Sequence, residues 1–415
     1  MKEKVGILSL GCPRNLVDSE NFIARLNLKG YPIVDINKAD IAVVNTCCFI
    51  DEAKRESLDA ILDLIALKKK GKLKKVIVYG CLAQRYKDTL RKELPEVDAF
   101  VGTPSLNHSP GRFPLTPRHY AYLKVCESCI NQCSFCIIPG IKGKFSSLEI
   151  NSVLKRAGAL DKEKISELNI IGQDISAYGM DLYGTRMLTQ LLSKIIKSAK
   201  NIGWFRLLYL YPDSVIGPLV GLMKEEPRIC RYIDLPIQHI NDRLLKLMRR
   251  RTGRKEIITL IRKIRKELPD AAIRTSLITG FPSETEAEFK ELLEFIQEAK
   301  FERMGVFIYS QEEGTPAYSL PGQIPHSEKV RRFNALMSAQ QKVSRENNEK
   351  LLGRVLDVLI DEEAEGSYLG RTQYDAPEVD GLVYVNSQKK LAAGDFVKVR
   401  ITDTLEYDLV GEAKA

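Results

Sequence analysis

Histidine and long apolar runs are scarce in this chain, which has only four histidines among 415 residues. A structural zinc site needs four closed ligands, usually paired cysteines or histidines at short spacing, and no histidine stands near a cysteine group at that spacing. No apolar run approaches the roughly 18 residues that a membrane-spanning helix needs, and no secretory signal opens the chain. We therefore expect a protein that has no membrane segment and is not exported.

The chain has nine cysteines, an odd and unevenly placed set that suits a reducing compartment, so we expect it in the cytoplasm. Four crowd together at Cys126, Cys129, Cys133 and Cys136, and the last three form the spacing CxxxCxxC. Three thiolates at this spacing can hold three irons of a cubane cluster and leave the fourth iron open for chemistry. Zinc is the main alternative. Cys126 offers a second CxxC register, but only Cys129 completes CxxxCxxC, so we expect Cys126 not to be a ligand.

Three more cysteines follow short apolar runs in the first third of the chain, where strand and helix patterns alternate. The runs 5–10, 41–44 and 76–79 are typical of strands buried on both faces of a parallel sheet, and Cys12, Cys47 and Cys81 come just after them. Ligands gather beyond the carboxyl ends of such strands. One cysteine there is most often a small buried hydrophobe, but three in the same place predict a second three-thiolate cluster site. For Cys48 we expect only packing.

The middle of the chain predicts a partial barrel. Six strand candidates alternate with amphipathic helical stretches at 121–125, 167–171, 204–210, 232–236, 273–279 and 303–309. Six βα units indicate an incomplete version of the eight-unit barrel, and the cysteine run follows its first strand, on the face that carries chemistry. Other strand ends carry polar groups whose role stays open between loop structure and function: Gln173, Asp174, Arg206, Gln238, His239 and the stretch 280–282. We interpret the arginines at 249–251 as a solvated face.

The last stretch changes character after a helical pattern at 327–350. Short strand patterns at 355–360, 381–385, 396–401 and 408–411 predict a small antiparallel barrel. Residues 350–415 hold 8 Lys plus Arg against 13 Asp plus Glu, a net charge of −5, whereas the whole chain carries +9. A nucleic-acid platform should be basic, so a basic protein partner fits this segment better.

These residues carry a resemblance to a known family. CxxxCxxC at the end of a first barrel strand, with Phe135 before the last cysteine, resembles the radical S-adenosylmethionine superfamily. The three distant cysteines and a terminal barrel similar to the TRAM module narrow the resemblance to the methylthiotransferases, over the whole chain. GCPRNLVDSE at 11–20 resembles the branch that modifies ribosomal protein S-twelve, whereas the tRNA-modifying branch typically has a GCQMN-like stretch. The same branch is indicated by NTCCFIDEAK (45–54), GCLAQRY (80–86), LTPRHYAYLK (115–124) and DAPEVDG (375–381).

The resemblance implies an α/β fold in three domains and a reaction that uses two 4Fe-4S clusters. The domains are a flavodoxin-like parallel-sheet domain at 1–114, a partial (β/α)6 radical S-adenosylmethionine barrel at 115–346 and a TRAM barrel at 347–415. Cys129, Cys133 and Cys136 would hold the cluster that binds S-adenosylmethionine. The auxiliary cluster, which carries the transferred sulfur, would be held by Cys12, Cys47 and Cys81.

The implied activity is methylthiolation of the β-carbon of an aspartate in the ribosomal protein, with electrons from a donor such as flavodoxin or ferredoxin. The alternatives are 2-methylthiolation of a tRNA adenosine and a non-catalytic electron carrier. Asp375, Glu378 and Asp380 are candidates for docking a basic partner, and an exposed acidic turn without such a role is the equal alternative. Three positions depart from the branch, since Cys126 and Ser128 replace the usual serine and glycine of SEGC and Cys48 replaces a usual glycine.

Overall fold

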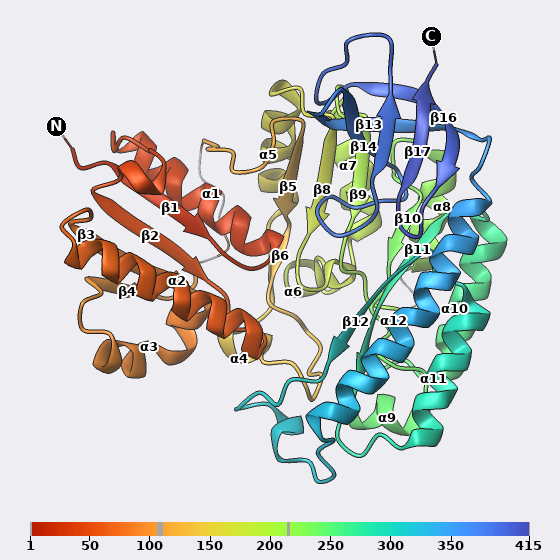
Figure 1. The fold of residues 1–415 in the computed structure, drawn as a ribbon, viewed down its shortest axis with the longest axis horizontal. Coiled ribbons are helices and arrows are strands. Elements are labelled where there is room, and N and C mark those ends of the chain that lie inside the picture. The colour runs from red at the N-terminus through yellow and green to blue at the C-terminus, as the bar shows by residue number, and fades with distance from the viewer. Residues whose placement is uncertain (1, 105, 107–110, 214–215, 415) are drawn as a thin grey trace.

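The computed structural model describes residues 2–104, 106, 111–213 and 216–414, and three β structures follow one another along them (Figure 1). A small parallel sheet comes first, a curved set of six parallel strands second and a closed barrel last. No helix in these ranges is long and apolar enough to cross a membrane. The fold class predicted from the sequence is confirmed.

The first sheet is parallel, with its strands in the order β1-β2-β3-β4. Apolar side chains line both faces, because α1 packs on one face and α2 and α3 pack on the other. A parallel sheet covered in this way leaves its carboxyl edge as the place where loops and ligands can gather. The elements are β1 (Val5–Ser9), α1 (Pro13–Leu28), η1 (Ile36–Lys38), β2 (Ile41–Thr46), α2 (Asp51–Lys69), β3 (Lys75–Gly80), α3 (Cys81–Glu93) and β4 (Ala99–Val101).

Six parallel strands form the predicted partial barrel, as two three-stranded sheets, β5-β8-β9 and β10-β11-β12. Backbone hydrogen bonds from the Cys230 N–H to the Phe205 carbonyl and from the Leu210 N–H to the Asp234 carbonyl join the two sheets. The strands are β5 (Tyr120–Lys124), β8 (Glu167–Ile171), β9 (Trp204–Leu207), β10 (Tyr232–Asp234), β11 (Ala272–Thr279) and β12 (Arg303–Ile308). β9 and β10 end earlier than predicted, because their chains turn into loops at the barrel's carboxyl end.

Helices cover the outside of this barrel and build its largest apolar core. The long ones are α5 (Ile150–Lys162), α7 (Leu188–Ser198), α8 (Ile216–Glu225), α10 (Arg254–Glu267), α11 (Glu286–Ala299) and α12 (His326–Glu349). Shorter elements shape the loops: β6 (Cys126–Glu127), α4 (Ile138–Lys142), β7 (Ser146–Ser147), η2 (Ile175–Ala177), α6 (Met180–Tyr183), α9 (Asp242–Leu247) and η3 (Pro316–Ser319).

The last β structure is a closed five-stranded barrel in the order β13-β14-β15-β17-β16. All pairs are antiparallel except β15 with β17, which run parallel. The sequence did not indicate β14. The strands are β13 (Val355–Ala364), β14 (Ser367–Thr372), β15 (Val383–Asn386), β16 (Phe396–Thr404) and β17 (Leu409–Ala413).

This terminal barrel lies over the end of the partial barrel where the parallel strands begin (Figure 1). Its side chains reach into that end and pair with buried charges there. Arg371 contacts Glu167 at 2.8 Å, and the buried Arg206 donates to the Gln373 carbonyl at 2.8 Å. Unpaired charges in a protein interior are costly, so these contacts fix the terminal barrel on the larger one.

The same seam corrects one prediction from the sequence. Asp375 is buried and accepts from Arg303 Nε at 2.8 Å, and the buried side chain of Asp380 accepts from the Tyr232 hydroxyl at 2.6 Å. Glu378 is exposed but accepts from the Tyr120 hydroxyl. Docking of a basic partner by Asp375 and Asp380 is therefore wrong, since buried arginines and tyrosines of the chain itself already occupy these carboxylates.

Candidate functional site

The loop triplet, Cys129, Cys133 and Cys136, lies in the loop after β6, at the carboxyl end of the barrel strands. All three thiols are partly accessible. Burial raises the pKa of Cys129 to about 11 and that of Cys136 to about 12, and a negative charge on Cys133 contributes to both increases. The three sulfurs thus lie within electrostatic reach of one another, as thiols that share one cluster must.

Two polar side chains direct N–H groups at these sulfurs. The Cys129 sulfur accepts from the Asn131 backbone N–H at 3.4 Å and from Asn131 Nδ2 at 3.3 Å, and Asp174 holds that amide at 2.7 Å. Arg250 Nη1 lies 3.6 Å from the Cys133 sulfur, and its guanidinium stacks on Tyr211. Such donors orient ligating sulfurs and tune the cluster that they hold.

Arg250 is a functional candidate that the sequence interpretation missed. Its neighbours Arg249 and Arg251 are exposed, as a solvated face requires, but Arg250 is half-buried. Its Nη2 donates to the Pro236 carbonyl at 2.6 Å, which fixes the guanidinium beside the loop triplet. Only the folded chain brings this arginine to Cys133, so no local pattern could have indicated the contact.

The sheet-edge triplet, Cys12, Cys47 and Cys81, lies at the carboxyl ends of β1, β2 and β3, where the sequence predicts it. Gly11 makes the convergence possible: its φ is +85°, and a Cβ at this position would lie 2.7 Å from the Cβ of Cys47. Burial raises the pKa of Cys81, and negative charges on Cys47 and Cys12 add to the increase. The three thiols therefore form a second group.

One guanidinium lies between the two triplets. Arg14 Nε donates to the Cys12 sulfur at 3.4 Å, and Arg14 Nη1 donates to the Gly172 carbonyl, just past β8, at 3.0 Å. Burial by itself would raise the pKa of Cys12, but the charge and hydrogen bond of Arg14 lower it below its usual value. The same charge also offsets part of the rise in the pKa of Cys136 that burial causes. Both triplets thus face one region.

The donor set of each triplet fits an iron–sulfur cluster. In the described part of the chain, no three His, Cys, Asp or Glu side chains converge closely enough to hold a single metal ion. A cubane cluster makes a different demand, because each thiolate binds a different iron and the sulfurs surround the cluster instead of meeting at a point. Grouped thiols with N–H donors aimed at their sulfurs meet that demand.

Four buried charged side chains pair with one another where the first sheet domain meets the barrel. Lys124, at the end of β5, contacts both Asp18 of α1 and Glu127, the latter at 2.7 Å. Lys142 approaches the same two carboxylates at 3.3 and 3.4 Å. Each of these four side chains is at most 6% exposed. We call them the buried charge network; it joins the first sheet domain to the barrel.

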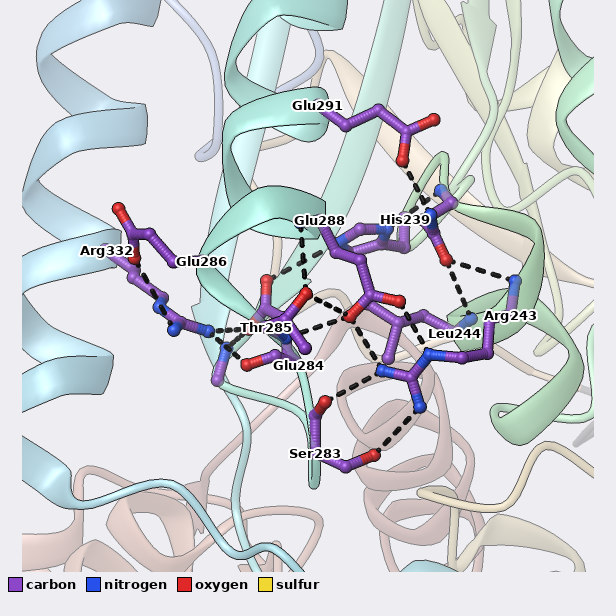
Figure 2. A network of polar contacts seen from close by, with 12 residues as sticks. His239, Arg243, Leu244, Ser283, Glu284, Thr285, Glu286, Glu288, Glu291 and Arg332 are labelled. Carbon is purple, nitrogen blue, oxygen red and sulfur yellow. Dashed lines mark hydrogen bonds and ion pairs between the residues drawn. The ribbon is translucent and has the colours of Figure 1, made fainter.

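The polar strand ends around His239 are structural. Figure 2 shows His239, from the loop between β10 and α9, directed at Glu284 in the loop before α11. His239 Nδ1 accepts from the Asn241 N–H at 3.0 Å, so Nε2 carries the proton and faces Glu284 Oε1 at 3.4 Å. Glu284 also pairs with Arg332 of α12 at 3.0 Å. These groups satisfy one another and hold three elements together.

The two remaining thiols near the triplets are packed. Cys48 is fully buried in the apolar core of the first sheet domain. Cys126 is fully buried in the barrel core, and its sulfur donates to the Asp174 carbonyl at 3.6 Å. Neither thiol therefore belongs to the loop triplet or to the sheet-edge triplet.

Comparison with known proteins first defines the class. Family models match residues 4–102 (Uncharacterized protein family UPF0004), 123–296 (Radical SAM superfamily) and 352–413 (TRAM domain). In fold the chain resembles the radical S-adenosylmethionine methyltransferase TsrM from Kitasatospora setae, with a TM-score of 0.51, 13% identity and coverage of 89% of this chain and 81% of that one. The cobalamin-dependent S-adenosylmethionine radical enzyme OxsB also gives a TM-score of 0.51, at 12% identity over 81% and 56% of the two chains. The chain is a radical S-adenosylmethionine enzyme.

Sequence relatives narrow the class to one family. The "Ribosomal protein uS12 methylthiotransferase RimO" of Clostridioides difficile is 44% identical, over 99% of this chain and 98% of its own length. The proteins of the same name from Citrifermentans bemidjiense and Thermoanaerobacter sp. are each 46% identical, over 99% of this chain and 98% and 100% of their lengths. The chain belongs to the RimO methylthiotransferase family, which confirms the resemblance found in the sequence.

Proposed function

We propose that this protein transfers a methylthio group to the β-carbon of an aspartate in ribosomal protein uS12. The observation that carries the proposal is the placement of two cysteine triplets around one arginine, Arg14. A reaction that needs a radical at one place and a sulfur donor at another must bring both to the same substrate carbon. Two facing triplets provide that arrangement, and the family membership supplies the substrate.

The loop triplet is proposed to hold a 4Fe-4S cluster that leaves one iron for S-adenosylmethionine. When bound, this cluster and S-adenosylmethionine supply a radical able to remove hydrogen from an unactivated carbon, which no side-chain base can do. Asn131 and Arg250 keep their N–H groups on the sulfurs of Cys129 and Cys133, so the ligands are oriented before the cluster binds.

The sheet-edge triplet is proposed to hold the auxiliary 4Fe-4S cluster, which supplies the sulfur that is transferred. Gly11 lets Cys12 and Cys47 approach each other, and Arg14 favours the thiolate of Cys12. A thiolate, not a thiol, is the form that binds iron.

The proposed division of the chain is 1–114 for the auxiliary cluster, 115–346 for the radical reaction and 347–415 for contact with the substrate. The terminal segment keeps its net charge of −5 and suits a basic ribosomal protein, although Asp375 and Asp380 are buried within the seam. Glu362, Glu363 and Asp403 are exposed there and remain free to face such a partner. A cytoplasmic flavodoxin or ferredoxin is proposed as the electron donor.

A substrate comparison tests the function. The reconstituted protein is incubated with S-adenosylmethionine, a reductant and either uS12 or bulk tRNA, and both macromolecules are analysed by mass spectrometry. We expect one methylthio group on an aspartate of uS12 and none on tRNA. A modification found only on tRNA would establish the alternative, a tRNA methylthiotransferase.

Iron analysis tests the cluster assignment separately. Replacing Cys129, Cys133 and Cys136 together with alanine should leave about half of the iron bound and abolish formation of 5′-deoxyadenosine, if each triplet holds one cubane. The matched triple variant of Cys12, Cys47 and Cys81 should lose the other half and still form 5′-deoxyadenosine. Cleavage that persists in the first variant would show that other groups bind the cluster.

A further inference from the structure

Arg14 is held in a fixed orientation across a domain boundary. It comes from the first turn of α1, yet Nη1 donates to the Gly172 carbonyl of the barrel, 158 positions away in sequence. Its guanidinium stacks on Tyr209 with 4.2 Å between the guanidinium carbon and the ring centroid. Together with the contact to Cys12, these interactions fix the guanidinium plane before any ligand arrives.

The guanidinium also has unused hydrogen-bond donors. An arginine has five N–H groups, and the contacts to Cys12 and Gly172 use Nε and Nη1. Nη2 has no hydrogen-bond partner in the described part of the chain, and no carboxylate within it forms an ion pair with Arg14. Three other buried cations are paired with carboxylates: Lys124 with Asp18 and Glu127, Arg206 with Glu167, and Arg303 with Asp375.

A guanidinium that contacts the Cys12 sulfur but forms no ion pair with a carboxylate of the described residues matches one feature of the substrate. The carboxylate of an aspartate is attached directly to its β-carbon, so it lies one covalent bond from the atom that reacts. That carboxylate must leave water and enter a region lined by cysteine ligands, where an anion needs a cationic partner. The group that binds it must therefore lie between the two triplets, where Arg14 lies.

We infer that Arg14 binds the carboxylate of the substrate aspartate and so selects this residue and orients its β-carbon between the two triplets. The inference rests on the proposed function. The planar fork of a guanidinium suits a carboxylate, and a fork held by Tyr209 and Gly172 loses little freedom when it binds. Arg14 is thus a substrate-binding residue that determines specificity, in addition to its contact with Cys12.

A binding cycle tests this inference without relying on turnover. Two peptides are bound to the reconstituted holoenzyme, and fluorescence anisotropy gives both affinities. One contains the substrate aspartate before modification, and the other has asparagine at that position. The unaltered enzyme should prefer the aspartate peptide by roughly 10- to 100-fold, because a charge-assisted contact is lost with asparagine. In Arg14→Gln the preference should fall close to one.

Controls separate this role from a structural one. Arg345→Gln removes an exposed arginine of α12 and should leave the preference unchanged. Arg14→Lys keeps the charge but loses the fork, so its preference should lie between the two extremes even if Arg14→Gln fails to bind its clusters. Iron content and the electron paramagnetic resonance spectrum of the reduced protein are recorded for each variant.

Two results would overturn the inference. One is an unchanged preference for the aspartate peptide in Arg14→Gln or Arg14→Lys, with or without an altered spectrum, since Arg14 would then serve only the cysteine ligands. The other is the absence of any preference in the unaltered enzyme. If that enzyme methylthiolates uS12 in either case, the proposed function stands and the role of Arg14 alone is wrong; if it modifies only tRNA, the function itself fails.

Discussion

Cys126 shows how a single thiol beside a ligand run is kept out of it. Its sulfur is fully buried and donates to the Asp174 carbonyl. Gly172 makes room for it, because a Cβ at Gly172 would lie 2.4 Å from that sulfur. Burial also raises the pKa of Cys126 well above its usual value. Because its sulfur packs into the barrel core and donates to a backbone carbonyl, we expect Cys126 not to bind iron.

Cys126→Ala should therefore leave the clusters intact. We expect unchanged iron content and unchanged formation of 5′-deoxyadenosine, with a loss of stability of about 1 kcal/mol for the small cavity. Iron analysis, product chromatography and thermal unfolding measure the three quantities. Cys129→Ala is the matched control and should lose iron and cleavage, whereas iron loss in Cys126→Ala would support the alternative CxxC register.

For single residues, the sequence could indicate the candidate cysteine ligands but not the arginines that contact their sulfurs. Cys129, Cys133 and Cys136 are neighbours in the chain, so their spacing alone points to a cluster. Arg14 and Arg250 reach sulfur only through folding. Arg14 contacts the barrel through Gly172, and Arg250 contacts a cysteine 117 positions earlier. Neither hydrophobic periodicity nor a short motif indicates contacts between residues so far apart in the chain.

Helix α11 begins with a capping box reinforced from another helix. Thr285 is the N-cap, and its backbone N–H donates to Glu288 Oε2 at 2.8 Å. Arg243 of α9 donates to both carboxylate oxygens of Glu288, at 2.6 and 2.7 Å (Figure 2). Burial opposes ionisation, but these hydrogen bonds outweigh it and lower the pKa of Glu288 to about 2. The carboxylate thus ties the start of α11 to α9.

Glu288→Gln should destabilise the protein by about 1–2 kcal/mol at neutral pH. Because the folded pKa lies below the ordinary value of 4.5, the carboxylate stabilises the fold above pH 4.5, and this contribution is lost as the pH falls toward 2. The difference in the free energy of unfolding between the variant and the unaltered protein should therefore be smaller at pH 3 than at pH 5. Thermal unfolding at both pH values measures it.

Glu294→Gln is the control for that series, because Glu294 is exposed on the same helix. It should change the unfolding midpoint little at either pH. A Glu288→Gln deficit that stays constant down to pH 3 would mean that the charge of Glu288 is not what stabilises α11.

Sequence patterns located most elements but hid one hairpin. β13 and β14 are joined at Glu365 and Gly366, which both have positive φ values. The acidic run at 361–365 has no apolar alternation, so the end of β13 and all of β14 looked like a loop. Their pairing comes from closure of the barrel, in which β14 also contacts β15. Local propensity carries little information about such closure.

For the whole molecule, the buried charge network joins the first sheet domain, which carries one triplet, to the barrel, which carries the other. Asp18 is its only member from the first sheet domain, and it contacts both Lys124 and Lys142. The charge of Lys142 also offsets part of the rise in the pKa of Cys81, so the network lies within electrostatic reach of the sheet-edge triplet. A charge removed here leaves two buried lysines with one carboxylate between them.

Asp18→Asn should uncouple the formation of 5′-deoxyadenosine from the transfer of the methylthio group. Breaking a buried pair costs about 3–5 kcal/mol, and the first sheet domain should then shift against the barrel. We expect 5′-deoxyadenosine to form at close to the normal rate while methylthiolated product per 5′-deoxyadenosine falls several-fold. Chromatography of both products gives the ratio.

Glu163→Gln is the control for Asp18→Asn, since Glu163 forms only a partly exposed pair with Arg112. Its product ratio should match that of the unaltered protein. If Asp18→Asn also keeps that ratio, the network stabilises the fold without aligning the triplets.

The contacts between the partial barrel and the terminal barrel affect the order in which the protein can fold. Glu167, Arg206 and Arg303 lie in strands of the partial barrel, but Arg371, Gln373 and Asp375, which complete their contacts, follow later in the chain and are translated after them. Until these residues are made, Glu167 and Arg206 can pair with each other, but Arg303 lacks its partner Asp375. The barrel therefore completes these buried contacts only after residues 371–375 are made, and we expect a chain truncated before Arg371 to be less stable.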